Sequence, residues 1–432
     1  MELTRRSLLA LAGAGALAGC AGQLPEPDVT AAGFGEDASG VVRVWTRGAT
    51  QAGVQGVVEA FHASQDRIRV EVTPVLDGQY VTKLATAIRG REVPDVVDID
   101  DINAMLFIFR DVFTDMTPLV RSLPYADLLS PGHLQLATVG ERVYGVPFLA
   151  DVSMLWSNDD LLDRAGVDPA SLTTMEAAVD AAERVTALGD GSIGWSLPGN
   201  TAGIIGFVTQ PNTWATGARL LEGDVGSQTG DIAGNATLRQ VLELYRRLQT
   251  GGSLQPGAFA DAGTTWGADF RAGQVGLFPS NFSSAVLAAD ADMQARTSVR
   301  LLPGPGGGTA FFDGGDNMCM PRGARNPSGA WEFIRFALDV AQQERLPENG
   351  FIPIRSDAAT DRYRQDFPLA VLPLDQISQG FAPRTLPYNL LYNQPDSPYF
   401  ALVREAVFGG DVDAALETGQ AAYDRILEQA QR

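Results

Sequence analysis

The chain has 432 residues, more than one hydrophobic core usually organises, so two domains of ordinary size are expected. Its formal net charge of −20 at pH 7 gives a surface that repels nucleic acid and anionic lipid, which argues against both as partners. The two histidines are isolated and neither has a metal-ligand spacing, so the sequence predicts no metal site and no cofactor.

The first 19 residues have the pattern of an export signal. A pair of arginines precedes a short apolar run at residues 8–17, and a Leu-Ala-Gly-Cys motif then ends at Cys20. The run is too short to cross a bilayer as a helix, which needs about 20 apolar residues. The arginine pair resembles a twin-arginine signal, and the motif resembles a bacterial lipobox. We therefore expect cleavage after residue 19, a lipid on Cys20, and a protein anchored to the outer face of the bacterial cytoplasmic membrane.

A tether is expected between this lipid and the first domain. Residues 24–40 are mainly Pro, Gly, Ala and acidic residues without periodicity, so the sequence predicts a flexible linker over residues 20–40. If Cys20 carries the lipid, Cys319 has no cysteine to pair with and no disulfide is expected.

Residues 41–99 predict a parallel sheet with crossover helices. Runs with strand character alternate with apolar residues at helical spacing. The expected elements are a strand at 41–45, a helix at 54–61, a strand at 68–72, a helix at 80–88 and a strand at 96–99. Since ligands of such sheets bind beyond the carboxyl ends of the strands, those ends hold the first functional candidates. They are Trp45 with Thr46 and Arg47, the turn at residues 76–78, and Asp98, Asp100 and Asp101.

The rest of the chain predicts mixed strands and helices with long loops. Short strands are expected at residues 144–147, 154–156 and 274–278, and a strand pair at 311–320 around two glycines. Residues 190–236 are rich in glycine and hold a Pro-Asn-Thr-Trp stretch, which favours a loop. The tail from residue 397 is mostly helical in pattern.

No motif for an enzyme is present. The sequence has no Gly-x-Ser-x-Gly elbow and no His-Glu-x-x-His, and its glycine-rich stretch at residues 304–308 lacks the Lys and Ser/Thr of a phosphate loop. Asp98, Asp100 and Asp101 come from one strand end, so they cannot by themselves flank a glycosidic bond. A surface-anchored glycan hydrolase stays open as one alternative, although nothing in the sequence requires catalysis.

Several short motifs, taken in order, resemble the extracellular solute-binding proteins of ABC importers for sugars and polyols. After the lipobox they are Val-Pro-Asp-Val-Val at 93–97, Tyr-Gly-Val-Pro at 144–147, Leu-Trp-Ser-Asn-Asp at 155–159, Phe-Arg-Ala-Gly-Gln-Val-Gly at 270–276, the glycine pair at 314–315 and Gly-Phe-Ile-Pro-Ile-Arg at 350–355. Each motif is weak alone, but their order across nearly the whole chain is specific.

The resemblance implies an α/β fold of the type II periplasmic-binding-protein kind. Two lobes would close by a hinge on a ligand held between them. The N-terminal lobe would comprise residues 41–148 and about 282–340, and the C-terminal lobe residues 149–281 and about 341–432. The resemblance also implies a monomer that performs no chemistry and delivers a sugar or polyol to the transmembrane permease subunits.

A narrower resemblance, to the branch that binds glycerol phosphate and its diesters, keeps a ligand such as glycerophosphocholine as an alternative. It rests on Asp-Gly-Gln-Tyr at 77–80, Gln-Pro-Asn-Thr-Trp at 210–214 and Arg384, which lies near the phosphate-binding arginine of that branch. Two departures count against this specificity, because Asp151 stands where the branch has a serine and Phe351 replaces a common tyrosine.

For a sugar, carboxylates and amides would bond the hydroxyls while aromatic faces cover the C–H surfaces. From the strand ends and the resemblance together, we expect ligand contacts from Trp45, Asp77, Tyr80, Asp100, Asp101, Asp151, Trp214, Ser280, Asn281, Gly314, Gly315, Asp316, Phe351 and Arg384.

Overall fold

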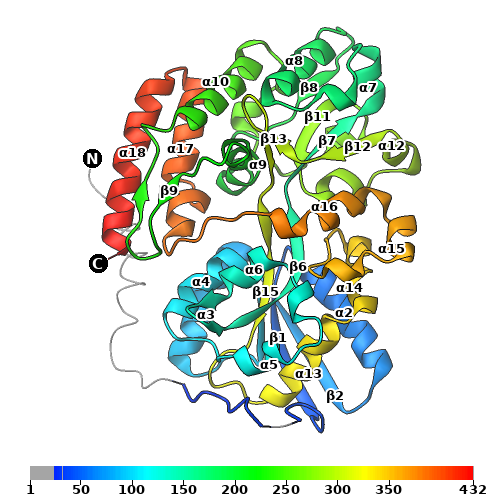
Figure 1. The fold of residues 1–432 in the computed structure, drawn as a ribbon, viewed down its shortest axis with the longest axis vertical. Coiled ribbons are helices and arrows are strands. Elements are labelled where there is room, and N and C mark those ends of the chain that lie inside the picture. The colour runs from blue at the N-terminus through cyan, green and yellow to red at the C-terminus, as the bar shows by residue number, and fades with distance from the viewer. Residues whose placement is uncertain (1–23, 32, 432) are drawn as a thin grey trace.

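The computed structural model describes residues 24–31 and 33–431 and has two α/β halves, each built on its own sheet (Figure 1). The expected signal peptide and the lipidated Cys20 lie outside these residues. We call the half at the bottom of Figure 1 the first lobe and the half at the top the second lobe.

The first lobe is organised around a five-stranded sheet of order β2-β1-β3-β15-β6. Its strands are β1 (Gly40–Arg47), β2 (Ile68–Val75), β3 (Val96–Asp100), β6 (Gly145–Val152) and β15 (Asp313–Cys319). The crossover helices are α2 (Gln51–Ser64) and α3 (Asp77–Gly90), and α4 (Asp101–Phe109) follows β3. Strand β1 pairs in parallel with β2 and β3, so the predicted parallel arrangement is confirmed. Strand β15 is antiparallel to β3 and β6.

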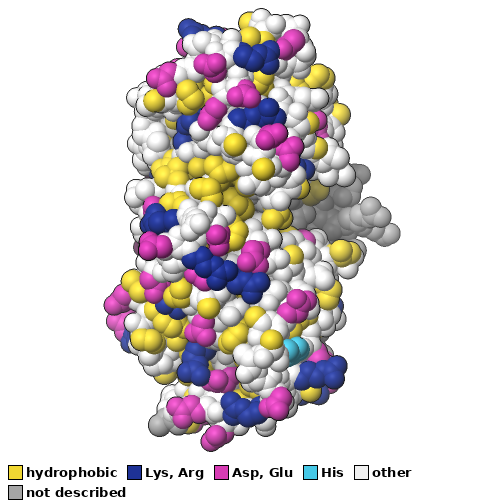
Figure 2. Space-filling model, turned by 90° about the vertical axis from the view of Figure 1, so that its right-hand side faces the viewer, with side chains coloured by type: hydrophobic (Ala, Val, Ile, Leu, Met, Phe, Trp, Pro, Cys, Tyr) yellow, Lys and Arg dark blue, Asp and Glu magenta, His cyan; other side chains and the backbone are white. Residues whose placement is uncertain are grey.

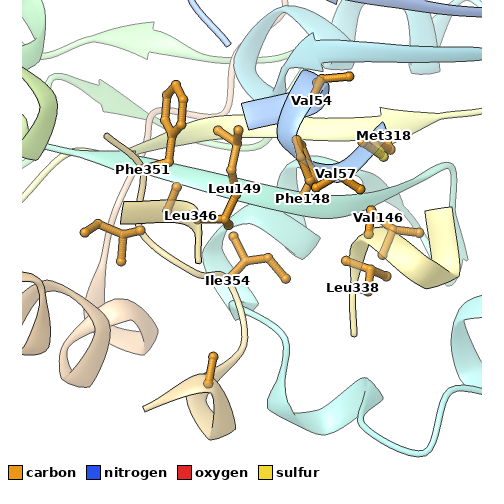
Figure 3. Close-up of a cluster of buried hydrophobic side chains, with 14 of the residues drawn as sticks. Val54, Val57, Val146, Phe148, Leu149, Met318, Leu338, Leu346, Phe351 and Ile354 are labelled. Atoms are coloured by element: carbon orange, nitrogen blue, oxygen red, sulfur yellow. The ribbon is translucent and has the colours of Figure 1, made fainter. Parts of the chain in front are cut away.

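Part of the first-lobe core lies between α2 and β6 (Figure 3). Val54 and Val57 lie on the buried face of α2, as their helical spacing predicts. On β6, Phe148 and Leu149 are fully buried, and Phe351 lies beside Leu149 in Figure 3 with 6% of its surface exposed. This core fixes the strands whose ends carry the polar residues described below.

The second lobe contains a four-stranded sheet of order β12-β7-β11-β8. Its strands are β7 (Met154–Asn158), β8 (Ile193–Trp195), β11 (Val275–Ser280) and β12 (Thr297–Arg300). The main helices are α8 (Met175–Thr186), α9 (Ala202–Trp214), α10 (Ala236–Thr250), α17 (Pro398–Arg404) and α18 (Val412–Ala430). Helix α9 corrects the expected loop, because residues 202–214 form a helix despite Pro211 inside it. A second buried hydrophobic cluster joins these helices.

Two chain segments lie in the other lobe from the one expected. Strand β12 pairs with β7 of the second sheet, although residues 282–340 were grouped with the first lobe. The backbone of Ile352 exchanges hydrogen bonds of 2.9 and 2.8 Å with Ala150 of β6, although residues 341–432 were grouped with the second lobe. Both placements follow from strand pairing over a long sequence separation, which local patterns do not encode.

The described part of the expected tether is docked on the first lobe rather than free. Val29 and Ala38 are buried in the first core cluster. Glu26 forms an ion pair of 2.9 Å with Arg322 and accepts a hydrogen bond from the backbone N–H of Asp115. The segment is docked because its apolar side chains are buried on the first lobe, although its overall composition predicts a flexible linker.

Three crossings connect the lobes. The first is Ser153, between β6 and β7. The second is residues 301–312, between β12 and β15. The third runs from η9 (Ile377–Gln379), which contacts α6 (Pro131–Leu136) of the first lobe, to α17 of the second. All three lie next to the polar residues at the strand ends.

Candidate functional site

Charged side chains converge where β1, β3 and β15 meet. Arg47, at the end of β1, donates from Nε to both carboxylate oxygens of Asp316, at 3.1 and 2.9 Å. Its Nη1 lies 3.2 Å from Asp77 and 3.6 Å from Asp100. Asp100 and Asp316 are directly opposite each other in the β3–β15 ladder, so both project from the same face of the sheet. Arg47 therefore holds three carboxylates from three elements.

A buried hydroxyl pair supports Asp98 behind this arginine. Thr46 and Thr50 each donate a hydrogen bond of 2.7 Å to Oδ2 of Asp98, and Thr50 also lies 3.1 Å from Asp316. Burial, and then the neighbouring Asp316, raise the pKa of Asp98 well above its usual range. The carboxyl group of Asp98 is thereby held by hydrogen bonds from the first lobe itself.

A buried histidine forms the next part of the site. Nδ1 of His133 lies 3.3 Å from Asp313, and its Nε2 donates to the backbone oxygen of Gly314 at 3.0 Å. Burial disfavours the charged imidazolium, yet Asp313 and then Asp101 raise the pKa of His133 to about 9. The ring is therefore positively charged at neutral pH, with Asp313 as its ion-pair partner.

Asp101 is buried and Asp151 is partly buried, and both have carboxylate oxygens without hydrogen-bond partners. Within residues 24–31 and 33–431, both oxygens of Asp101 and Oδ1 of Asp151 have no hydrogen-bond partner. Asp101 lies 3.7 Å from Nε2 of His133. Burial raises the pKa of Asp151 to about 6, despite a hydrogen bond from Asn281 and the charge of Arg47. Buried polar groups in proteins are normally hydrogen-bonded, and one oxygen each of Asp98 and Asp313 also has no partner among the described residues, so this group of acids is the candidate ligand site.

Acidic side chains outnumber basic ones in this group, whereas the two kinds are mixed on the surface. Figure 2 shows acidic and basic side chains interspersed over one face of the molecule, with hydrophobic ones gathered in a band across it. We call this set of buried and partly buried side chains the carboxylate cluster; it consists of Asp98, Asp100, Asp101, Asp151, Asp313 and Asp316, with Arg47 and His133.

Aromatic side chains border the carboxylate cluster on the side of the second lobe. Phe312, in the second crossing, has its ring centre 5.4 Å from Phe207 and 5.5 Å from Trp214, both on α9. Phe381, in the third crossing, meets Trp214 edge-on at 4.8 Å. Trp214 is 4% exposed, so it is packed in this group and not held in a loop. We call these four side chains the aromatic wall.

Gly314 is the point at which the wall meets the cluster. A Cβ at this position would lie 2.9 Å from the backbone oxygen of Asp151, 3.4 Å from Phe312 and 3.5 Å from Phe207. A side chain there would have to displace backbone, so glycine allows the two parts to approach. Gly314 and its neighbour Gly315 lie within β15 and not in the expected turn of a strand pair.

Tyr388 extends the contact between the lobes. Its ring meets Phe312 edge-on at 6.5 Å. Burial, followed by Tyr392 and then Asp100 and Asp101, raises the pKa of Tyr388 well above its usual range. The phenol therefore stays protonated next to the first-lobe carboxyl groups.

The structure brings half of the predicted ligand-binding residues together. Those in or beside the carboxylate cluster are Asp77, Asp100, Asp101, Asp151, Asn281, Gly314 and Asp316. Trp214 lies in the aromatic wall. Their contact with a ligand remains a prediction.

Trp45, Tyr80 and Ser280 have other surroundings. The ring of Trp45 faces α3, where Nζ of Lys83 lies 4.5 Å from its centre. The hydroxyl of Tyr80 donates to the backbone oxygen of Trp45 at 3.2 Å, and its ring is buried. Ser280 is buried at the end of β11 and donates to the backbone oxygen of Asn281. Each side chain has a structural contact that accounts for its position.

Gly315, Phe351 and Arg384 also have structural roles. A Cβ on Gly315 would lie 2.2 Å from the backbone oxygen of Leu149, so this glycine is needed for strand packing. Phe351 belongs to the first-lobe core. Arg384 donates to the backbone oxygen of Thr138 at 3.0 Å, and burial lowers its pKa.

The sequence reasoning missed several members of the site. At the end of β1 the sequence favours Trp45 over its neighbour Arg47, and local spacing leaves His133 isolated. Asp313, Phe207 and Phe312 were not singled out. His133 and Asp313 are 180 residues apart in the chain and meet only because α6 packs on β15. The strand-end rule was the one signal that could have selected Arg47 in place of Trp45.

Comparison with known proteins places this geometry among binding proteins. A family model described as bacterial extracellular solute-binding protein matches residues 56–368. A binding protein of Brucella abortus is 25% identical over 297 residues, 67% of this chain and 69% of the relative. An arabinooligosaccharide-binding protein of Bacillus subtilis is 22% identical over 290 residues, 62% of each chain.

Solved structures share the fold. The sugar-binding protein MalE of Xanthomonas citri has a TM-score of 0.78 and 21% identity, covering 90% of this chain and 98% of its own. The GacH receptor of Streptomyces glaucescens has a TM-score of 0.76 and 19% identity, covering 90% and 99%. The predicted two-lobed α/β fold is confirmed by this similarity.

Proposed function

Since the chain belongs to the bacterial extracellular solute-binding proteins, we propose that it captures a carbohydrate between its lobes and delivers it to an ABC importer. The predicted class, a binding protein and not an enzyme, is confirmed by the family match. The observation that carries the choice of ligand is the position of buried, poorly satisfied carboxyl groups directly beside an aromatic wall.

A carbohydrate suits both parts of this site. Its hydroxyls donate hydrogen bonds that the oxygens of Asp101 and Asp151 otherwise lack. Its C–H faces pack on aromatic rings such as Phe207 and Phe312. Relatives named for arabinooligosaccharide and lactose support the same class; the lactose-binding protein of Rhizobium radiobacter is 28% identical over 160 residues, 36% of this chain and 35% of its own.

A glycerophosphodiester has less support. Arg47 already pairs with three carboxylates, and the remaining carboxyl groups of the cluster would repel a phosphate. Arg384, the expected phosphate ligand, bonds a backbone oxygen, and no described acidic group shifts its pKa. We therefore propose a carbohydrate, and not a glycerophosphodiester, as the ligand.

Closure of the two lobes would enclose this ligand. We propose that the three crossings, at Ser153, at residues 301–312 and at residues 377–397, act as the hinge, because site residues lie within or next to each of them. A ligand that contacts both lobes only in the shut state shifts the population toward that state.

We propose export and anchoring as first read from the sequence: a signal peptide at residues 1–19, a lipid on Cys20, and a monomer at the outer face of the cytoplasmic membrane. The family is an extracellular one. Across residues 24–31 and 33–431, no helix combines the length and apolarity needed to cross a bilayer. Because Glu26 and Val29 already contact the first lobe, a lipid on Cys20 would keep that lobe near the membrane.

The anchor has a direct test. Cells expressing the wild type or Cys20→Ala are labelled with radioactive palmitate and fractionated. We expect label and membrane association in the wild type and loss of both in the variant. Label retained in Cys20→Ala would contradict the lipid site.

The ligand class is tested by thermal unfolding and calorimetry with mono- and disaccharides, polyols, glycerol-3-phosphate and glycerophosphocholine. We expect a saturable rise in melting temperature with a saccharide or polyol and no turnover of it. A rise with the phosphate compounds alone, or with none of the panel, would contradict the proposed function.

A further inference from the structure

The carboxylate cluster has more acidic groups than basic ones, and the difference is not removed by internal pairing. Six carboxyl groups face two basic side chains: Asp98, Asp101, Asp313 and Asp316 are buried, Asp100 and Asp151 are partly buried, and the bases are Arg47 and His133. Burial raises the pKa values of Asp98, Asp101 and Asp151, so these acids hold protons more readily, and a cation that joined the cluster would favour their ionised forms.

Four of the six acids have close partners within the first lobe, as hydrogen bonds or ion pairs of 3.6 Å or less. Arg47 forms a two-point ion pair with Asp316 and lies 3.6 Å from Asp100. Asp100 also accepts a hydrogen bond of 3.2 Å from the backbone N–H of Asn103, so it caps α4. His133 pairs with Asp313 at 3.3 Å.

Asp98, the fourth, is held by the hydroxyls of Thr46 and Thr50 at 2.7 Å. These contacts are internal to the first lobe, and they would form whatever the ligand is. Asp101 has only the longer contact of 3.7 Å with His133, and Asp151 has a hydrogen bond from Asn281, so these two acids have the fewest contacts within the protein.

Asp101 and Asp151 lie close to each other within the carboxylate cluster. His133, whose Nε2 lies 3.7 Å from Asp101, donates to the backbone oxygen of Gly314, and Gly314 pairs with Asp151 in the β15–β6 ladder. Asp101 is fully buried, and among the described residues neither of its oxygens has a hydrogen-bond partner. Oδ1 of Asp151 also has no hydrogen-bond partner among the described residues. A hydroxyl of a neutral sugar can bond such an oxygen, but it brings no charge to offset the surplus.

Resting on the proposed function, we propose that the ligand is a saccharide bearing protonated amino groups, which pair with Asp101 and Asp151 while the sugar ring packs on the aromatic wall. An ammonium group donates hydrogen bonds and supplies the missing charge at once. The wall favours a ring over a linear polyamine because Phe207, which is partly exposed and is backed by Phe312, offers an apolar face.

The test is calorimetry of the purified protein at pH 7.5 with three matched ligands: glucosamine, N-acetylglucosamine and glucose, each also as its β-1,4-linked disaccharide. They share a ring and differ in the amine, which is charged, acylated or absent. We expect the free amine to bind about tenfold or more tightly than its acetylated and hydroxyl counterparts, as one charge-assisted hydrogen bond provides.

The outcomes separate the inference from the proposed function. Equal or tighter binding of the neutral sugars overturns the amine and leaves a carbohydrate-binding protein. Binding of spermidine without binding of any saccharide overturns both, and so does the absence of binding across the whole set.

Variants locate the amine contact. Asp101→Asn and Asp151→Asn should each reduce the preference for the free amine from about tenfold to about twofold, because the affinity for the amine falls more than that for the neutral sugars. The control is Asp163→Asn, an exposed carboxylate on α7 (Asp159–Arg164), which should leave the preference unchanged. Because the readout is a ratio measured on one protein, a destabilised variant still reports it. A preference undiminished in both cluster variants overturns the proposed contact.

Discussion

The two sides of the site consist of different kinds of side chain. On the first lobe, charged side chains at strand ends are fixed by ion pairs and hydroxyls, as Arg47 and Asp316 illustrate. On the side of the second lobe, rings from α9 and from two crossings pack on one another, with Phe312 among them. The polar side therefore depends on sheet register, whereas the aromatic side depends on how the crossings sit against α9. Predictions that alter one side alone test this division.

The largest effect is expected from Arg47→Ala on the polar side. Removing the guanidinium leaves Asp316 buried without its main counter-charge, so we expect a loss of about 3–5 kcal/mol in the free energy of unfolding. Urea unfolding at pH 7 measures it. Arg345→Ala, which breaks an exposed pair with Glu348, serves as the control and should cost less than about 1 kcal/mol. Equal losses in both variants would show that Arg47 does not organise the cluster.

The next effect has the opposite sign. In the folded protein the pKa of Asp151 is raised from 3.8 to about 6, because burial outweighs its hydrogen bond with Asn281 and the attraction of Arg47; Asp316 and Asp100 add repulsion. The folded state thus holds this proton more tightly, so wild-type stability falls as pH rises from about 4 to about 6 and stays reduced above that.

Asp151→Asn removes that loss. Without ligand, we expect the variant to be more stable than the wild type at pH 8, by up to about 3 kcal/mol, and similar to it at pH 4. Denaturant unfolding at both pH values gives the difference. A variant equally or less stable at pH 8 would mean that the protein already neutralises Asp151.

Gly314→Ala changes the position at which the aromatic wall meets the carboxylate cluster. The new Cβ would lie 2.9 Å from a backbone oxygen of β6, so we expect a loss of about 1–3 kcal/mol in stability and weaker ligand binding. Gly78→Ala in α3 is the matched control, because its Cβ would meet nothing within 4 Å among the described residues. Similar losses in both would point to a general glycine effect and not to this position.

The sequence predicted the polar side better than the aromatic side. Asp100 and Asp101 were found because the end of β3 and the start of α4 are encoded locally, by an apolar run followed by a change of period. His133 was missed because its partner Asp313 is 180 residues away in the chain. Trp214 was expected in a loop because its Pro and Asn neighbours favour turns, but packing of α9 overrides that local preference.

The smallest effect, and the one that addresses the aromatic side directly, is expected from Phe207→Ala. Phe207 is partly exposed and packs on Phe312 at 5.4 Å, so its removal should cost little stability. If the ring covers a sugar face, carbohydrate affinity measured by calorimetry should fall about tenfold. Phe259→Ala, an aromatic that is 53% exposed elsewhere on the second lobe, should leave affinity unchanged. Full affinity in Phe207→Ala, together with a loss in Asp101→Asn, would mean that the polar side alone holds the ligand and that the wall serves only to join the lobes.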